Sequence, residues 1–441
     1  MSWKAVKIGD FLKRSKIPID IEDSKYYNRV TIRINHNGVS LRDSEIGKKI
    51  GTKKQFILKK GQFILSKIDA RYGAFGVAPE EVDGAIITGN FWAYDVDESL
   101  MNINWLNQYT NSKVFYDLCE RASSGITHRK YLNEDFFLNH ELLIPEIHEQ
   151  DSHVFFIKKR KDSIGILENE NSHQLDLLKK LRQQILQDAV QGKLVPQDPH
   201  DEPASKLLER IKAEKEQLIR EKKIKKDKPL PEIKPEEIPY EIPENWAWCR
   251  LGDICTKIGS GSTPKGSNYS IQGIPFFRSQ NIHDSGLVFD DIKFINNQVQ
   301  TQMAGTIVEQ LDLLLNITGG SLGRCAIVSK NFKEGNVSQH VCIIRPLSLN
   351  NAYFHNIILS PYFQKLIFES TTGAGREGLP KYNLEKFIVP IPPLIEQNRL
   401  QNKIEQIMTL CDELERSIQQ NQKYTQELLQ VALKEALEPS D

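Results

Sequence analysis

The chain has 441 residues, which is enough for two or three domains that each have their own core. Hydrophobic residues make up 39% and charged residues 26%, as in ordinary soluble proteins, and no apolar run approaches the roughly 20 residues that a membrane span needs. The 58 basic and 58 acidic residues cancel, which argues against a free-standing polycationic nucleic-acid binder.

The N-terminal stretch MSWKAVKIGDFLKR lacks the apolar core of a secretory signal. None of the six cysteines belongs to a CxxC pair, the spacing typical of zinc ligands and redox sites. We therefore expect a cytoplasmic protein whose thiols are reduced and buried.

The first segment, residues 1–147, predicts a mixed domain. Short β-rich runs, RVTIRI, QFILKKGQFILSKI and GAIITGNFWAYDV, precede a helical pattern over 103–122 and a polar loop, SSGITHRKYLNE. Residues 1–75 hold 17 Lys and Arg against 7 Asp and Glu, whereas residues 76–150 hold 4 against 13. Two interpretations stay open: a domain with separate basic and acidic faces, or an ordinary mixed surface.

The central segment, residues 148–228, predicts a helix, a break and a second helix. Leu178, Leu181 and Ile185 recur at the spacing of one helical face. Gly192 predicts the end of the first helix, because glycine readily adopts the left-handed conformation found there.

The second helical pattern starts after Asp201 and Pro203, which together resemble a helix start signal. A charged run follows. Residues 229–250 are a proline-rich linker that is expected to be extended and to lack a core. We expect its tryptophans, Trp246 and Trp248, to dock onto the next domain.

The next segment, residues 251–392, repeats the order of the first. Strand-like runs, a helical pattern, a polar loop and KFIVPIPPLIEQ follow one another as they do in the first domain, which ends with ELLIPEIHEQ. Gly73 matches Gly323 and Asn90 matches His340, each pair 250 residues apart. The retained order and the nearly constant offset predict a true two-fold repeat.

A long helical pattern follows each repeat, and its apolar residues lie alternately three and four residues apart. This spacing is typical of a coiled coil, and a helix of about 40 residues is roughly 60 Å long. Polar interruptions at matching places suit antiparallel packing of the two helices with polar pairs that set the register, and the strict spacing over about four heptads disfavours packing of each helix on its own domain alone. The predicted seam contains Ile164, Leu167, Leu178, Leu181, Ile185, Leu400, Ile404, Ile407, Leu414, Ile418 and Leu428.

Most signatures of catalysis are absent from the sequence. GSGSTPKG (259–266) is rich in glycine, but its lysine and glycines are misplaced for a phosphate-binding loop. No glycine-rich fingerprint follows a strand in a way that would hold a nucleotide or adenosyl cofactor, and no His, Asp and Glu cluster has metal-ligand spacing. His340 has no catalytic triad pattern around it and is interpreted as structural. We expect a chain without catalytic residues, metal or cofactor.

Two polar, basic loops stand at equivalent places in the repeats, SSGITHRKY (123–131) and TTGAGREGLPKY (371–382). DARYG (69–73) and TGGSLGR (318–324) accompany them. Such residues can contact phosphates or base edges, whereas a single such loop could equally be a solvated turn, so the duplication favours DNA contact. The candidate DNA-binding residues are Arg71, Arg129, Lys130, Ser262, Thr263, Lys265, Arg324, Arg376 and Lys381.

The stretch GKLVPQDPHDEPASKLLERIKAEKEQLI (192–219) resembles the central conserved region of the specificity subunit of type I restriction–modification systems. TGGSLGR, SQHVCIIRP, GAGREGLPKYNL, and VPIPPLIEQ with its terminal helix, resemble that family's target-recognition domain. The resemblance covers almost the whole chain and is weakest in the first domain, where DARYG and TGN replace TGGSLGR and SQH.

The resemblance implies an α+β fold, with two mixed α/β target-recognition domains in a pseudo-two-fold repeat separated by two long antiparallel coiled-coil helices. In these terms the segments are recognition domain 1 (1–147), the central conserved helical spacer region (148–228), the linker (229–250), recognition domain 2 (251–392) and the distal conserved spacer helix (393–441).

The resemblance also implies a non-catalytic subunit, in a bacterial or archaeal cytoplasm, that reads a bipartite, asymmetric site in double-stranded DNA. Each domain would read one half, and helix length would set the unread spacer. The implied partners are two modification subunits, which methylate adenine with S-adenosylmethionine, and restriction subunits, which cleave with ATP and Mg²⁺; no membrane is involved.

Two other classes of function stay open on the sequence. The neutral charge would suit a tandem coiled-coil scaffold that joins two proteins without reading DNA, and a steep salt dependence of DNA binding would exclude it. A stand-alone nuclease or methylase is disfavoured by the missing motifs, and catalysis by the purified chain alone would revive it.

Overall fold

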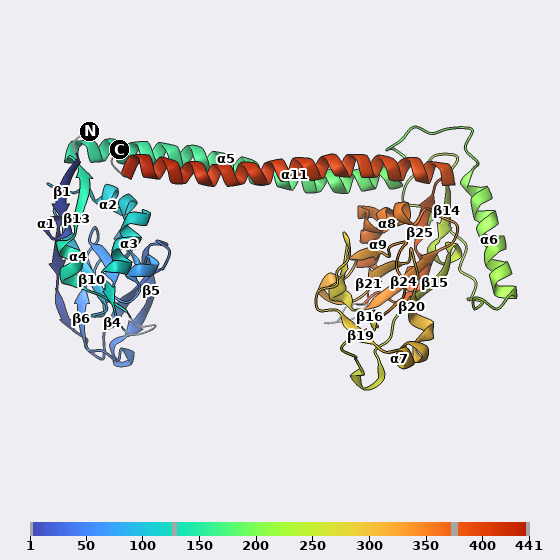
Figure 1. The fold of residues 1–441 in the computed structure, drawn as a ribbon, viewed down its shortest axis with the longest axis horizontal. Helices are drawn as coiled ribbons and strands as arrows, with labels where there is room; N and C mark the ends of the chain where they lie inside the picture. Colours follow the sequence, from blue (N-terminus) through green and yellow to red (C-terminus); the bar gives the residue numbers. More distant parts are fainter. Residues whose placement is uncertain (1–2, 126–129, 372–377, 438–441) are drawn as a thin grey trace. The chain divides into compact units, whose positions relative to one another are not determined.

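The computed structural model describes residues 3–125, 130–371 and 378–437. Its contacts divide the chain into two units, which Figure 1 shows as ribbons. Unit 1 comprises the residues up to Ser172 together with those from Gln419 onward, and unit 2 comprises His173–Ile418. Each unit therefore contains one of the predicted repeats and a part of both long helices.

Unit 1 combines short strands with short helices, and the start of one long helix. Its strands are β1 (Trp3–Lys7), β2 (Leu12–Ser15), β3 (Pro18–Asp20), β4 (Tyr26–Ile32), β5 (Val39–Ile46), β6 (Lys54–Ile57), β7 (Phe63–Ser66), β8 (Phe75–Val77), β9 (Ile86–Ile87), β10 (Phe91–Val96), β11 (Ser123–Ser124), β12 (Tyr131–Leu132) and β13 (Glu141–Pro145). Its helices are α1 (Ile8–Phe11), α2 (Ile103–Tyr109), α3 (Lys113–Arg121), α4 (Glu134–Asn139) and the beginning of α5 (Ile147–Val190).

Unit 2 is built in the same way, with one additional helix before its first strand. Its strands are β14 (Ala247–Arg250), β15 (Cys255–Ser260), β16 (Ile274–Phe277), β17 (Ile282–His283), β18 (Gly286–Leu287), β19 (Lys293–Ile295), β20 (Ile307–Val308), β21 (Leu313–Asn316), β22 (Cys325–Ile327), β23 (Gly335–Val337), β24 (Val341–Pro346) and β25 (Ile388–Ile391). Its helices are α6 (Ala204–Arg220), α7 (Asn297–Gln302), α8 (Asn351–Leu359), α9 (Pro361–Glu369), α10 (Lys381–Lys386) and the beginning of α11 (Leu394–Leu437).

The sheets confirm the predicted repeat. In unit 1, β1 pairs antiparallel with β13, and a second sheet has the order β2-β10-β7-β8; in unit 2, β14 pairs with β25, and the equivalent sheet has the order β15-β24-β21-β22. A further sheet in each unit is built differently, β3-β6-β9-β4-β5 in unit 1 and β19-β16-β23-β20 in unit 2. The two units therefore agree most closely in the first two sheets of each. The two-stranded sheet is the one whose last strand leads into a long helix.

Matching hydrogen bonds follow the predicted offsets. The Asn102 backbone N–H donates to Gln150 Oε1 (2.7 Å) in unit 1, and the Asn350 N–H donates to Gln397 Oε1 (2.9 Å) in unit 2. Both glutamines also donate to the carbonyl of a proline at 3.0 Å, Pro145 at the end of β13 and Pro392 directly after β25. Each buried glutamine thus ties the first turn of a long helix to the domain in front of it, because a buried amide must be paired.

The predicted helix over 103–122 is wrong in one respect, since it consists of two helices. Ser112 caps α3 by accepting a hydrogen bond from the Phe115 N–H, and Ser360 caps α9 in the same way at the equivalent place of unit 2. Serine at this position stabilises a new helix start, so it breaks the apparently continuous pattern. Trp105 and Phe115 remain in the core of unit 1, as predicted, at 0% and 1% exposure.

The two long helices run antiparallel, as predicted. In unit 1, His153 near the start of α5 has its Nδ1 2.7 Å from the carbonyl oxygen of Ala436 near the end of α11. In unit 2, Arg182 near the end of α5 donates to Asp412 (2.6 Å) and Glu415 (3.0 Å) of α11. The start of α5 thus contacts the end of α11, and the end of α5 contacts an earlier part of α11. The two helices therefore run in opposite directions.

The seam is narrower than predicted. Burial recurs at every seventh residue, through Ile157, Ile164, Asn171, Leu178 and Ile185 of α5 and through Ile404, Cys411, Ile418, Thr425 and Ala432 of α11. The alternating members lie at its edge, so their prediction as core positions is wrong: Leu167, Leu181, Leu414 and Leu428 are 46–50% exposed. Two paired helices bury only a narrow strip of each helix surface. Each leucine beside that strip therefore packs against it with one side and exposes the other side to solvent. Leu400 is buried and Ile407 is partly buried, as predicted.

The break after α5 is confirmed, and the start signal for α6 is corrected. Gly192 has a left-handed φ of 71°, as a helix end with glycine requires. The helix α6 begins at Ala204 without a side-chain cap, because the Asp201 carboxylate instead accepts two hydrogen bonds from Arg399 of α11, at 3.1 and 2.5 Å. This bidentate pair holds the hinge against the first turns of α11.

The linker docks through its tryptophans, as predicted, but it is shorter than predicted. Trp246 is 6% exposed, and its indole N–H donates to the buried carboxylate of Glu396 at 3.0 Å. Trp248 lies in β14 and packs against Tyr240, and β14 pairs with β25, so strand β14 belongs to the second domain. Among the described residues no helix is both long and apolar enough to span a membrane.

All six cysteines are free and buried, in agreement with the expectation of reduced, structural thiols. Burial raises the pKa of the Cys119 and Cys342 thiols to about 12, far above neutral pH. Both thiols are therefore protonated at neutral pH and pack as small apolar side chains.

Candidate nucleic-acid interface

Four loops meet at one end of unit 2, beginning with the loop that follows β15. The Gly261 backbone N–H donates to the Val341 carbonyl (3.0 Å), and the Ser262 N–H donates to the Val337 carbonyl (3.2 Å). The Thr263 hydroxyl donates to the side-chain oxygen of Gln339 at 3.0 Å. These bonds fasten the Ser-Thr-Pro-Lys loop onto the turn between β23 and β24.

Gly261 is required for this contact, which gives a first prediction. A Cβ at Gly261 would lie 1.9 Å from the Val337 carbonyl oxygen, so Gly261→Ala should separate the two loops and destabilise the chain by about 1–3 kcal/mol. The matched control is Gly259→Ala, two residues away, where a Cβ meets nothing within 4 Å. Chemical denaturation of both variants checks this result, and equal stabilities would contradict it.

The third and fourth loops join at the same turn. The Ile317 N–H donates to the His340 carbonyl (3.0 Å), and the Thr318 hydroxyl lies 2.7 Å from His340 Nδ1. Thr318 also forms a bridge with Gly378, and the Leu379 N–H donates to the Ile317 carbonyl (2.9 Å). His340 thus has a structural role between two loops, as predicted. We call residues 261–265, 317–324, 338–340 and 378–381 the unit 2 loop surface.

The structure brings five of the predicted residues to this surface. Ser262, Thr263, Lys265, Arg324 and Lys381 are all exposed there. Lys381 forms an ion pair with Glu385 at 3.0 Å, whereas Arg324 makes no ion pair within the described part of the chain. An exposed cation with rotatable donors can bind a phosphate or a base edge. Arg376 lies outside the described residues.

The same backbone frame exists in unit 1, with fewer exposed cations. The Lys67 N–H donates to the Asn90 carbonyl (2.9 Å), and the Leu132 N–H donates to the Lys67 carbonyl (2.8 Å), as at the equivalent residues of unit 2. Arg71 is half-buried, with its guanidinium 4.5 Å from the centre of the Tyr72 ring. Lys130 pairs with Glu120 at 2.9 Å, and Arg129 lies outside the described residues.

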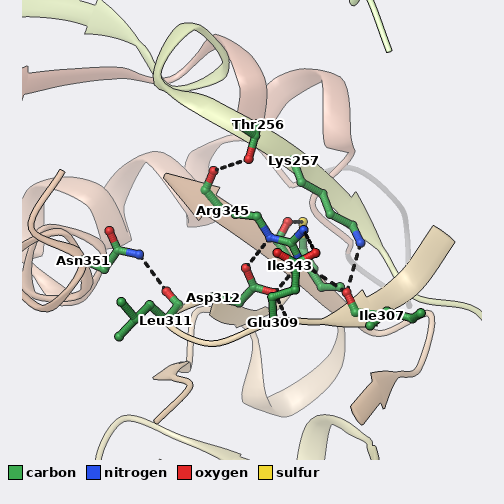
Figure 2. A network of polar contacts seen from close by, with 10 residues as sticks. Thr256, Lys257, Ile307, Glu309, Leu311, Asp312, Ile343, Arg345 and Asn351 are labelled. Atoms are coloured by element: carbon green, nitrogen blue, oxygen red, sulfur yellow. Dashed lines mark hydrogen bonds and ion pairs between the residues drawn. The ribbon is translucent and has the colours of Figure 1, made fainter. Parts of the chain in front are cut away.

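An ion pair with a buried carboxylate joins β24 to the residue that precedes β21, two strands that border the unit 2 loop surface, and Figure 2 shows it. Arg345 of β24 donates to both carboxylate oxygens of Asp312, at 2.7 and 2.8 Å, and the Asp312 side chain is 0% exposed. Arg345 also pairs with Glu309 and donates to the Ile307 carbonyl (3.2 Å). Burial lowers the pKa of the neighbouring Lys257, and the charge of Arg345 lowers it further.

The sequence interpretation missed this network, although the repeat contains a signal for it. Gln62 and Asp95 lie 250 residues before Asp312 and Arg345, and they also bond to each other, at 2.7 Å. Two equivalent pairs with different chemistry indicate a structural position that must be polar. The pair fixes β21 and β24, so it positions the loops that extend from them.

Comparisons with known proteins agree with this geometry. Residues 243–424 match the family model described as the type I restriction modification DNA specificity domain. The chain is 36% identical over 263 residues to the specificity subunit of the type I restriction enzyme EcoAI of Escherichia coli. This match covers 58% of this chain and 44% of that protein. It is 37% identical over 250 residues to the EcoEI specificity subunit of the same species, which covers 54% and 40%. The chain thus spans less than half the length of these two relatives.

Other proteins are matched along nearly their whole length at lower identity. The MjaVIII specificity subunit of Methanocaldococcus jannaschii is 19% identical over 442 residues, covering 98% of this chain and 92% of that protein. Among solved structures, a chain from a study of assembly and conformational transition of the type I R-M system has a TM-score of 0.60 at 16% identity, covering 99% of this chain and 97% of that chain. The HsdS subunit from Thermoanaerobacter tengcongensis has a TM-score of 0.56 at 17% identity, covering 99% and 96%. These two structures show a common fold.

Residues 243–424 are therefore similar to the type I restriction modification DNA specificity domain. The curated proteins that the chain matches are specificity subunits of type I restriction enzymes, and they are what its sequence is similar to.

Proposed function

We propose that the chain is the DNA-reading subunit of a type I restriction–modification complex and that it recognises a split, asymmetric DNA site. The observation that carries the proposal is the meeting of four polar loops, with exposed Arg324 and Lys381, at one end of a domain that the chain contains twice. Two related but different domains suit two different half-sites, as a symmetric dimer suits a palindrome.

In this proposal the chain itself is non-catalytic, and its partners perform the chemistry. Two modification subunits would methylate adenine with S-adenosylmethionine, and restriction subunits would cleave with ATP and Mg²⁺. The partners would also supply part of the positive charge that binds DNA phosphates, which accounts for a reader whose own basic and acidic residues cancel.

The test is selection of duplexes from a random-sequence DNA library by the chain together with a modification subunit from the same organism. The expected result is enrichment of two short sequences separated by a fixed number of unread base pairs, with affinity that falls steeply as salt rises. Enrichment of no split sequence would refute the proposal. DNA binding that barely responds to salt would instead favour the tandem protein-interaction scaffold.

Arg324 gives a second prediction within this proposal. Arg324→Ala should reduce discrimination at one position of one half-site by about 1–3 kcal/mol if the guanidinium reads a base edge, and leave the other half-site unchanged. Competition binding with single-base site variants measures this. The control is Lys330→Ala, which removes an exposed charge outside the unit 2 loop surface. Unchanged discrimination at every position would show that Arg324 reads no base.

A further inference from the structure

Unit 1 contains a hollow that has no counterpart in the sequence predictions. It measures about 690 Å³ and lies against the sheet of β4, β5, β6 and β9. Two chain segments close one side, Ser66–Asp69 and Thr88–Phe91. Both segments belong to the backbone frame that unit 1 shares with the unit 2 loop surface, through the bond from the Lys67 N–H to the Asn90 carbonyl.

The alternation of β4 explains why this hollow is lined by arginine. Val30 and Ile32 face the core, where they are 6% and 9% exposed. Successive side chains of a strand point to opposite faces, so Arg29, Thr31 and Arg33 alternate with the core-facing side chains, and these three residues line the hollow together with Val30. A strand that buries its aliphatic residues on one side thus presents a row of donors on the other.

The floor of the hollow is apolar and fixed. Ile50 and Ile86 are 5% and 4% exposed and belong to one small cluster. Gln55 is 3% exposed, and its amide donates to the Thr52 carbonyl at 2.9 Å, which holds the side chain in place. The floor therefore offers aliphatic surface beside a fixed amide, and it does not depend on a ligand for its shape.

The charged groups around the hollow differ in how firmly they are held. Arg29 is bound to Asp43 through two hydrogen bonds of 2.5 and 2.7 Å, so its role is structural. Arg42 is 61% exposed and lies 3.4 Å from the same carboxylate. Arg33 is exposed and makes no ion pair within the residues that the structure describes, and the exposed Asn90 also lines the hollow. Arg33 and Asn90 are thus donors available to a ligand.

We propose that this hollow is the surface with which unit 1 reads its DNA half-site, and that Arg33 and Asn90 contact base edges there. This inference rests on the proposed function and assigns it to particular residues. Arg pairs in a bidentate way with guanine and Asn with adenine in the major groove, and aliphatic side chains contact the thymine methyl group. Arg42, at the exposed edge, contacts a phosphate. Unit 1 therefore reads DNA mainly from a sheet, and unit 2 from its loop surface.

The experiment is selection from a random-sequence duplex library by the complete complex with its modification subunit, using wild-type chain, Arg33→Ala and Asn90→Ala. Each variant is expected to lose about 5- to 150-fold of its discrimination at one position, in the half-site that Arg324→Ala leaves unchanged. Arg33→Lys keeps the charge but loses the bidentate geometry, so it should relax the same position. Lys113→Ala, which removes a charge that is 89% exposed on α3, should leave both half-sites unaltered.

Three results would overturn the inference. Wild-type preferences retained in both half-sites by Arg33→Ala and Asn90→Ala would mean that the hollow reads no bases. A uniform loss of affinity for all sequences, with a shallower salt dependence, would make Arg33 a phosphate contact only. Loss of preference in the half-site that Arg324→Ala also affects would mean that the hollow does not read the half-site assigned to unit 1. Absence of any split site for the wild-type complex would instead refute the proposed function itself. Thermal unfolding confirms that each variant is folded.

Discussion

Replacement of Arg345 by alanine is expected to destabilise the chain by about 3–5 kcal/mol, because it leaves the fully buried Asp312 carboxylate without its partner. The same change should disorder the unit 2 loop surface, since Arg345 and Asp312 fix the strands from which those loops extend. Chemical denaturation measures the first effect, and protease sensitivity of residues 317–324 measures the second. A loss below about 1 kcal/mol would mean that water replaces the guanidinium at little cost.

The repeat supplies an internal rescue for this experiment. Arg345→Asp alone should be at least as damaging as alanine, because it places a second acid beside Asp312. The triple change Glu309→Lys, Asp312→Gln and Arg345→Asp installs the residues that unit 1 has at the equivalent positions, where Gln62 donates to Asp95 at 2.7 Å. It should recover more than half of the lost stability. Failure to recover would show that the surroundings of the pair are not equivalent in the two units.

Lengthening both long helices by seven residues is expected to change the spacing of the recognised half-sites, on the proposed function. Seven residues add about 10.5 Å to a helix, and base pairs are about 3.4 Å apart, so the unread spacer should grow by roughly three base pairs. Duplication of Leu178–Gln184 in α5 and of Asp412–Ile418 in α11 preserves the seven-residue burial pattern. Library selection with the complete complex reads out the spacer directly.

Duplication in only one helix is the control for the paired insertion. It puts the two sets of buried residues out of step, so it should destabilise the chain and yield no complex with a defined spacer. The paired insertion should keep the half-site sequences themselves unchanged, because it does not touch the loops. An unaltered spacer in a folded paired variant would mean that the helices do not determine the distance between half-sites.

The repeat, the antiparallel helices and the buried cysteines could be predicted from the sequence because each depends on local periodicity or on order along the chain. The exact seam could not. Spacing alone cannot tell Leu178, which is 5% exposed, from Leu181, which is 47% exposed, since both continue a three-four pattern. Which member is buried depends on how the partner helix is rotated, and this is set by contacts between residues more than 200 positions apart, such as Arg182 with Asp412.

The loops of unit 2 were recognisable because glycine, serine and threonine clusters mark turns in any context. The hollow of unit 1 was not recognisable, because Arg33 and Asn90 belong to segments that are far apart in the sequence. They line the same hollow only because β4 pairs with β9. A single arginine on a strand is an ordinary surface residue until the sheet order is known. The excess of basic residues over 1–75 left two interpretations open, and it singled out neither Arg33 nor Asn90.

The seven-residue burial pattern bears on how accurately the register of the two long helices is set. Ile185 and Cys411 belong to one cluster, and two steps of seven lead from them to Asn171 and Thr425, so we expect these two polar residues to share a layer. A slip of one heptad would set Asn171 against an aliphatic layer and leave its amide unpaired, at a cost of about 1–3 kcal/mol. In the proposed function, that slip would shift one half-site relative to the other by roughly three base pairs. By disfavouring that slip, the polar layer would keep the chain from binding DNA sites with the wrong spacing.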